Sequence, residues 1–150
     1  SLSSCSGRIC LLEVFEENNK KISNWLTVTH DEAIYDTFKK ELNKYKGTNR
    51  IDFKFEAAIM HIQTNSIENA QRLINLGKES GFNRCGIISS QRKIVVELIC
   101  KMSHSTPVFD QKNLITEDYL NYLVKHSNEK LVKSWESLSK YEIVIKNNFE

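Results

Sequence analysis

Strand-like and helix-like hydrophobic patterns follow one another along this chain without a regular strand–helix–strand rhythm. A doubly wound parallel sheet requires that rhythm, because each parallel connection needs a crossover helix of its own. The irregular order therefore predicts an α+β fold. No stretch has the composition of a linker, so we expect one domain over residues 1–150.

The periodicities place the elements along the chain. Strand patterns cover Arg8–Phe15, Trp25–His30, Phe53–Thr64, Cys85–Ser89 and Lys93–Cys100. The first two should form a hairpin with a long polar loop. Helix patterns run from a cap at Thr29 or Asp31 to about Tyr45, from Ser66 to Gly81, and onward from Thr116. The segment around Pro107 is expected to be a loop.

The longest strand pattern, Phe53–Thr64, changes its apolar face near Ala57 and Ala58. This predicts a bulge, or burial of both faces, at the two alanines. Lys54 and Glu56 point to the same side of a strand and are expected to form an ion pair or a solvated face.

The composition excludes several classes of function. The 150 residues carry 21 basic and 19 acidic side chains, a formal charge of +2, which excludes a histone-like electrostatic binder. The four cysteines show no C-x-x-C spacing, and we expect an intracellular, cytoplasmic protein with reduced thiols. Neither a signal peptide nor a membrane-spanning run is present, and metal-binding, Walker and Rossmann motifs are absent.

The densest polar cluster, Ser3–Arg8, combines small hydroxyls, a glycine and an arginine. Such a segment can bind a carboxylate or phosphate, although a disordered polar end is the alternative. His30 and His61 are either hydrogen-bonded core residues or site residues. Trp25 is expected in the core, or as an exposed ring that stacks on a base, whereas His104 and His126 are expected at the surface.

Several separated segments resemble the tRNA wybutosine-synthesising methyltransferases. They are Ser4-Cys5-Ser6-Gly7-Arg8, Trp25 with Thr29-His30, Phe53-Lys54-Phe55-Glu56 with Ile59-Met60-His61, Gly81-Phe82 with Gly86, and Asn128-Glu129-Lys130. The resemblance covers nearly the whole chain. It implies S-adenosyl-L-methionine as methyl donor, N4-methylation of the demethylwyosine-type base beside the anticodon of phenylalanine tRNA, and an α+β fold with mixed sheets and flanking helices.

The resemblance also implies a set of site residues. Expected to bind the methyl donor are Ser4, Cys5, Ser6, Gly7, Arg8 and Trp25. Expected to orient the acceptor or accept its proton are Glu56, His61 and His30. Expected to bind the tRNA substrate are Lys54, Phe82, Arg84 and Gly86. No metal is expected.

This chain departs from the family pattern at three places. Glu56 is followed by Ala57-Ala58 where the family has proline and phenylalanine, and the arginine after Phe82 is displaced by one position to Arg84. The family also has a segment upstream of the Ser4–Arg8 block, so we expect an N-terminal segment to be missing here.

Two other functional classes remain open. One is a non-catalytic tRNA-binding α+β module. The other is a hydrolase or redox protein that uses Cys5 and a histidine. If tRNA is the partner, its phosphates are expected to meet local basic surface, namely Lys20, Lys21, Lys39, Lys40, Lys44, Lys46 and Arg50.

Overall fold

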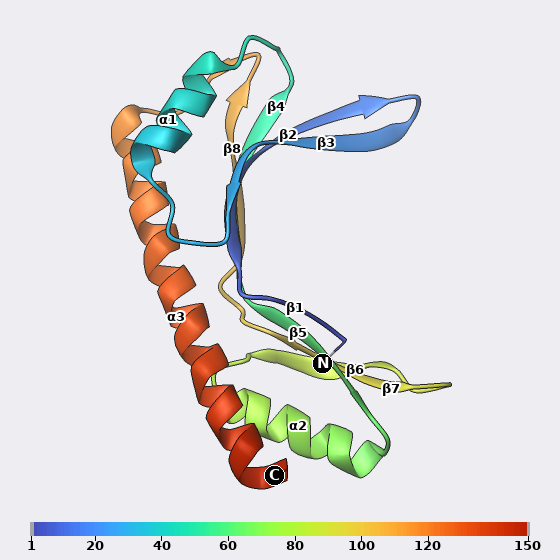
Figure 1. Ribbon diagram of the computed structural model, residues 1–150. Coiled ribbons are helices and arrows are strands. Elements are labelled where there is room, and N and C mark those ends of the chain that lie inside the picture. The colour runs from blue at the N-terminus through green and yellow to red at the C-terminus, as the bar shows by residue number, and fades with distance from the viewer. Residues whose placement is uncertain (1, 150) are drawn as a thin grey trace. The chain divides into compact units, whose positions relative to one another are not determined.

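A computed structural model describes residues 2–149 as two sheets and three helices (Figure 1). The predicted α+β class with flanking helices is confirmed. The sheets differ from the mixed arrangement expected, because every strand pair among the described residues is antiparallel. The described chain divides into two compact units, each with one sheet. The prediction of a single domain stays a prediction.

Unit 2 contains residues 8–56 and 103–131. Its sheet has the order β3-β2-β4-β8-β9, formed by β2 (Arg8–Glu17), β3 (Lys20–Thr29), β4 (Arg50–Glu56), β8 (His104–Asp110) and β9 (Lys112–Asn113). Helix α1 (Tyr35–Lys44) and the first half of α3 (Glu117–Phe149) belong to the same unit. Strand β8 contains Pro107 opposite Asp52 of β4, so the loop expected around Pro107 was wrong.

Unit 1 contains residues 2–7, 57–102 and 132–149 of the described chain. Its sheet has the order β1-β5-β7-β6, formed by β1 (Ser3–Cys5), β5 (Ile59–Thr64), β7 (Ile94–Ile99) and β6 (Arg84–Ser89). Helix α2 (Ile67–Glu79) and the second half of α3 complete it. The polar segment at the start is therefore a strand, and the alternative of a disordered end is wrong.

The hairpin between β2 and β3 is tighter than the long loop predicted. Nine residue pairs connect the two strands, and only Asn18 and Asn19 form the turn, both with positive φ (51° and 60°). Two left-handed residues match the twist of a two-residue hairpin, and asparagine tolerates that conformation well. Polarity had suggested a loop where the strands in fact continue.

The segment predicted as one long strand is two strands in two sheets. β4 ends at Glu56, Ala57 and Ala58 are buried, and β5 begins at Ile59. The backbone N–H of Ala58 donates to Ser134 Oγ over 3.0 Å, and its carbonyl accepts from the N–H of Cys100 over 3.1 Å. The apolar face changes at the two alanines because the chain leaves one sheet there, so the predicted position is correct and the predicted bulge is not.

One face of the unit 2 sheet carries the hydrophobic core of that unit. Residues of one parity on β2 and β4 have no exposed surface, namely Ile9, Leu11, Ile51, Phe53 and Phe55. Phe38 of α1 packs on Phe53, with ring centroids 5.7 Å apart. The residues of the other parity therefore lie on the opposite, polar face of the sheet.

The predicted N-terminal caps are confirmed for two of the three helices. Ser66 accepts a hydrogen bond from the N–H of Asn69 and caps α2, and Thr116 accepts one from the N–H of Tyr119 at the start of α3. Helix α1 instead begins after Ile34, which makes no side-chain cap. Thr29 and Asp31 form a turn with each other, so the cap predicted there was wrong.

Asn128 ties the segment before α1 to α3 within unit 2. Its Oδ1 accepts from the N–H of Ala33 over 2.7 Å, and its Nδ2 donates to the Ala33 carbonyl over 2.9 Å. The side-chain amide of Asn128 therefore satisfies both the backbone N–H and the backbone carbonyl of Ala33, which is buried. This accounts for Asn128 as a structural residue.

We predict that Gly81→Ala destabilises the fold by more than about 1 kcal/mol. Gly81 has φ +104°, and an added Cβ would meet Ser137 Oγ at 2.5 Å. Gly86→Ala is the matched control, because a Cβ there meets nothing within 4 Å. Urea unfolding of both variants measures the difference, and equal midpoints would contradict the prediction.

Candidate active site

The polar face of the unit 2 sheet brings three charged residues together at its end. Arg8 of β2 stands opposite Glu56 of β4, and Lys54 lies two residues before Glu56 on the same strand. The Nε of Arg8 donates to Oε2 of Glu56, and the Lys54 ammonium lies 3.4 Å from Oε1. The predicted Lys54–Glu56 ion pair is confirmed, and Arg8 joins it because its strand pairs in this register.

Trp25 of β3 contacts the arginine of this charged group. The Arg8 guanidinium carbon lies 5.1 Å from the centroid of the indole ring, which is a cation–π distance. The Trp25 side chain is nevertheless 53% exposed, so the expectation of a core residue was wrong and the exposed alternative holds. A bulge between Leu11 and Leu12 changes the register of the hairpin beside it. An aromatic surface of this kind is available for stacking.

The charges around Glu56 set its ionisation. Burial would raise the pKa of Glu56, but the hydrogen bond and charge of Arg8, followed by Lys54, outweigh burial and hold that pKa below its usual value. Glu56 is therefore ionised at neutral pH and is a weak proton acceptor. Of the two roles expected for it, orientation suits this environment better than proton abstraction.

Cys10 lies beneath the same cluster on the polar side of β2. Burial, with a smaller contribution from Glu56, raises the pKa of Cys10 to about 11. The residue keeps its proton at neutral pH and is not a nucleophile. Cys10 instead fills the space under the charged residues.

His30 follows the last residue of β3 and is exposed. The neighbouring pair is Ile9 with Thr29, so His30 lies one position beyond it, at the level of Arg8. The core alternative for His30 is excluded by its exposure. Its role at the site stays a prediction.

The signature block Ser4–Gly7 precedes Arg8 along the chain. Ser4 and Cys5 lie in β1 opposite Met60 and Ile59 of β5, and Ser6 is exposed. Gly7 is buried with φ +106°, a conformation that side-chain-bearing residues rarely adopt. The glycine of the signature is thus explained by backbone geometry, and donor binding by this block stays a prediction.

His61 belongs to unit 1 and sits in a polar row. Its Nδ1 lies 2.9 Å from Ser3 Oγ, and its Nε2 lies 2.8 Å from Oε2 of Glu97. Both ring nitrogens have partners other than Cys5, so the arrangement does not favour a hydrolase or redox centre built on Cys5 and this histidine. Ser3 was named only as the first residue of the polar Ser3–Arg8 cluster, and Glu97 was missed from the sequence. The one signal was a carboxylate in the otherwise apolar strand Ile94–Ile99.

Among the residues expected to bind the tRNA substrate, one is buried in the structure and others are accessible. Phe82 has no exposed surface and packs edge-on against Tyr141, with centroids 5.5 Å apart, so its expected contact with a base was wrong. It is a core residue of unit 1. Arg84 is exposed on β6, and Gly86 leaves open space above its Cα. Both remain predicted substrate contacts.

His104 was expected at the surface, but it packs between aromatic rings. Its ring stacks on Phe53 at 6.2 Å and lies 5.7 Å from Phe55, and its Nε2 is 3.2 Å from Ser127 Oγ. The serine and the two rings make it a structural residue of unit 2. Local polarity in the sequence hid this packing.

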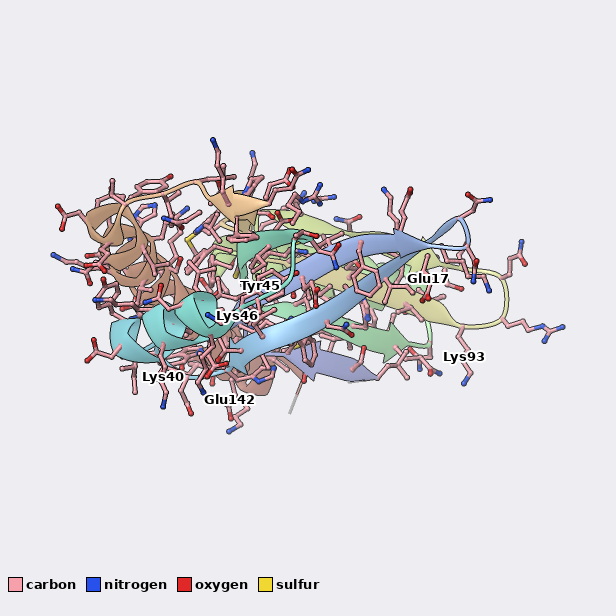
Figure 2. The ribbon with its side chains drawn as sticks, turned by 90° about the horizontal axis from the view of Figure 1, so that it is seen from above. Glu17, Lys40, Tyr45, Lys46, Lys93 and Glu142 are labelled. Carbon is pink, nitrogen blue, oxygen red and sulfur yellow. The ribbon has the colours of Figure 1, made fainter. Side chains whose placement is uncertain are left out.

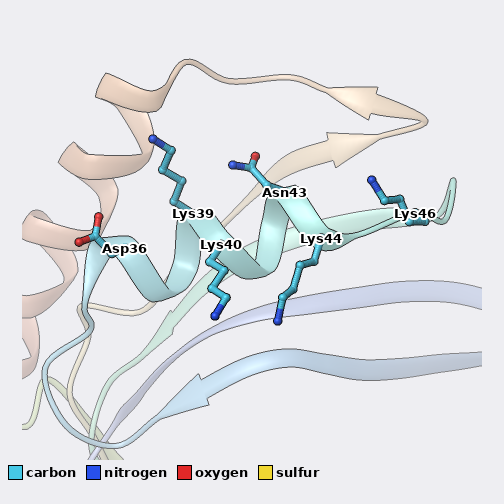
Figure 3. A pocket seen from close by; sticks show the side chains of 6 residues that line it. All are labelled: Asp36, Lys39, Lys40, Asn43, Lys44 and Lys46. Carbon is cyan, nitrogen blue, oxygen red and sulfur yellow. The ribbon is translucent and has the colours of Figure 1, made fainter.

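Lysines gather on α1 and the segment after it. They line a pocket of about 600 Å³ formed by Asp36, Lys39, Lys40, Asn43, Lys44 and Lys46. Figure 3 shows Lys40 and Lys44 extending to one side of the helix and Lys39 to the other, where it binds Glu117 at 3.1 Å. Figure 2 labels Lys40 and Lys46 in the view from above.

Comparison with known proteins decides the family. Residues 1–147 match the family model described as Methyltransferase TYW3. This chain belongs to that family. The tRNA(Phe) 7-((3-amino-3-carboxypropyl)-4-demethylwyosine(37)-N(4))-methyltransferase of Methanocaldococcus jannaschii is 32% identical over 142 residues, which cover 93% of this chain and 73% of that protein. The tRNA wybutosine-synthesizing protein 3 homolog of Bos taurus is also 32% identical, over 93% of this chain and 55% of the bovine protein.

Solved structures share the fold of this chain. The PH1069 protein from Pyrococcus horikoshii superposes with a TM-score of 0.88 at 27% identity, covering 95% of this chain and 74% of that one. A hypothetical protein from Aeropyrum pernix gives 0.76 at 25% identity, covering 95% and 87%. Among residues 2–149, no helix combines the length and apolar composition needed to cross a bilayer.

We predict that Arg8→Met raises the pKa of Glu56, because the burial remains while the main opposing interaction is lost. A lowered carboxyl pKa stabilises the folded state above the unfolded-state value, and that stabilisation is lost as pH falls through the folded-state pKa. The stability gap between wild type and variant should therefore shrink on acidification.

Carboxyl ¹³C NMR titration measures the Glu56 pKa directly. Arg50→Met is the control, because Arg50 binds Asp52 at 3.0 Å on the same strand. An unchanged Glu56 titration in Arg8→Met would contradict the assignment of the ion pair.

Proposed function

We propose that this chain is an S-adenosylmethionine-dependent tRNA methyltransferase that methylates N4 of the demethylwyosine-type base beside the anticodon of phenylalanine tRNA. Membership of the TYW3 family and the printed activity of the archaeal relative support the reaction. The four cysteines are unpaired, which supports a reducing compartment such as the cytoplasm.

The observation that carries the proposal is the charged group beneath Trp25. Arg8, Lys54 and Glu56 come from two strands, Trp25 comes from a third, and all four belong to the segments that define the family resemblance. A core packing role would not leave an indole half exposed against an arginine that is itself ion-paired. The group offers an aromatic face, two cations and one anion at one place.

These features suit the parts of the methyl donor. The adenine ring would stack on Trp25, and the methionine carboxylate would meet the positive charge of Arg8. The family resemblance also assigns donor contacts to the Ser4–Gly7 block of unit 1. Glu56 would hold Arg8 in place and orient the acceptor. The donor, when bound, supplies an electrophilic methyl group on a sulfonium, so the residues chiefly have to align the acceptor with it.

The base to be methylated must leave the anticodon-loop stack to reach such a group. His30, at the level of Arg8, and Lys54 are the proposed contacts with it in unit 2. Arg84 and Gly86 are proposed to contact the tRNA from unit 1. Phosphates of the tRNA would lie along the lysines of α1, where Lys40 and Lys44 share one side of the helix (Figure 3).

Donor binding separates the enzyme from a non-catalytic RNA-binding module. We predict saturable heat when S-adenosylmethionine is titrated into the protein, and loss of most of that heat in Arg8→Met. In a Trp135→Phe background, the emission of Trp25 should change on titration with the demethylated donor, because the ring is the proposed stacking surface. Absence of heat in the wild-type protein, together with unchanged Trp25 emission in the Trp135→Phe background, would favour the module.

We predict that Lys40→Gln with Lys44→Gln weakens tRNA binding whatever the tRNA sequence. The double variant should lower the slope of log affinity against log salt by about 1.4 to 1.8, since each lost phosphate contact removes roughly 0.7–0.9 from the slope. The control pair is Lys112→Gln with Lys125→Gln, which removes the same charge from exposed positions elsewhere in unit 2. Filter-binding isotherms from low to moderate salt measure the slopes. An equal loss in the control pair would show that only net charge matters.

A further inference from the structure

The polar face of the unit 2 sheet continues beyond the candidate active site. Leu12 of β2 is directly opposite Trp25 of β3 and Asp52 of β4, and Asp52 is directly opposite Pro107 of β8. Directly opposed residues of antiparallel strands share a face, so these four side chains form a row across the sheet. Asp52 lies four residues before Glu56 on β4, an even separation that keeps both on one face, about 13 Å apart along the strand.

The helices of unit 2 pack on the other face of this sheet. The ring of Phe38 in α1 packs on Phe53, and the ring of His126 in α3 lies 6.0 Å from that of His104, which is opposite Phe55. Figure 1 shows α1 and the first half of α3 on one side of β4 and β8. Among the described residues of unit 2, no helix covers the polar face.

The polar face is accessible on each side of its central strands. Ser105 and Pro107 of β8 are exposed, Ser23 and Trp25 of β3 are exposed, and Leu12 between them is half-buried. The face therefore offers flat apolar surface with hydroxyl groups beside it. A merely solvated face would carry long charged side chains at these positions instead.

Arg50 presents a fixed guanidinium on the same face. Its Nε donates to Oδ1 of Asp52 over 3.0 Å, and its Nη2 donates to Oδ2 over 3.2 Å, which is a bidentate pair. The side chain of Asp52 is only 11% exposed, whereas that of Arg50 is 46% exposed. The carboxylate thus holds the plane of an arginine that stays accessible, and such planes are surfaces on which nucleobases stack.

The charges of the face suit a chain that is anionic and carries flat groups. On this face the cations Arg8, Lys54 and Arg50 accompany the carboxylates of Glu56 and Asp52, which leaves one positive charge in excess. Single-stranded nucleic acid combines spaced negative charge with exposed base planes, and open sheet faces with aromatic or arginine side chains bind unpaired nucleotides. A paired stem keeps its bases inside and cannot use such a surface.

We propose that this surface binds unpaired nucleotides of the tRNA anticodon loop and that Arg50 stacks on one of their bases. We call it the sheet platform and define it as Leu12, Ser23, Arg50, Ser105 and Pro107. The choice of this RNA rests on the proposed function. The target base would reach the charged group at Arg8 while its neighbours in the loop lie along β4 toward Arg50. The lysines of α1 hold phosphates, so the sheet platform adds contact with bases.

The first test compares two RNAs, an anticodon stem–loop of phenylalanine tRNA and a fully paired duplex of the same stem. The wild-type chain should bind the stem–loop more tightly. Arg50→Lys keeps the charge and loses the planar fork, so it should weaken stem–loop binding by about 10-fold, leave the salt slope unchanged and leave duplex binding unchanged. Equal wild-type affinity for the two RNAs, or full stem–loop affinity in Arg50→Lys, would overturn the sheet platform.

The second test adds one charge to either face of a single strand, and it also serves if Arg50→Lys does not fold. Ser23 is opposite Val14, which is opposite Arg50, whereas the next residue, Asn24, is opposite Glu13 and belongs to the other face. Both residues are exposed. Ser23→Lys should steepen the slope of log affinity against log salt for the stem–loop by about 0.7, and Asn24→Lys should leave it unchanged. An equal change in both variants would overturn the sheet platform, because net charge alone would then explain it.

Donor binding and methylation separate the sheet platform from the proposed function. In an active wild type, Arg50→Lys should raise KM for tRNA by about 10-fold, with kcat and the heat of donor binding unchanged. Loss of donor heat in Arg50→Lys would assign Arg50 to the donor and overturn the sheet platform. A wild type that prefers the stem–loop but takes no donor would overturn the proposed function and support the sheet platform. A wild-type dimer in sedimentation that Ser23→Lys dissociates would show a second copy on this face and overturn the sheet platform.

Discussion

The two hydrogen bonds at Ala58 are the constraint on which the rest of the structure depends. The chain changes sheets at a buried position, and a buried backbone group without a partner costs about 1–3 kcal/mol. Ser134 Oγ and the N–H of Cys100 satisfy the two groups of Ala58. Because this break is satisfied, β4 can end at Glu56 in one sheet and β5 can place His61 in the other.

The alternation of side chains along each strand then decides on which face of its sheet each functional residue lies. Buried Phe53 and Phe55 fix the parity of β4, so Lys54 and Glu56 must lie on the polar face, and the register with β2 places Arg8 beside them. In β5, the apolar parity of Met60 and Ile62 leaves His61 on the opposite face. Neither cluster requires a dedicated loop, since each is held by strand pairing.

Sequence patterns correctly predicted the features that depend only on residues close together in the chain. The caps at Ser66 and Thr116, the left-handed Gly81 and the Lys54–Glu56 pair were all visible in the sequence. Pairings over long separations were not visible. Thr29 or Asp31 was predicted to cap a helix, Trp25 was predicted in the core or as an exposed ring, and Glu97 was not singled out. Strand register decides each of these positions. Family resemblance supplied the reaction, and the structure then separated buried Phe82 from the exposed members of the motif.

Some residues shared with the family, such as Asn128, hold the fold, whereas others, such as Arg8, belong to the candidate site. This difference has a consequence for how members of the family are compared. Asn128, Gly7 and Gly81 are explained by a doubly bonded amide and two left-handed backbones, so they would persist in a descendant that had lost methylation. Arg8, Trp25 and Glu97 instead make side-chain contacts at the polar faces of the sheets, outside the hydrophobic core. A paralogue that retains the first group and varies the second would keep this architecture for another purpose, and sorting relatives by those two groups would reveal it before any assay.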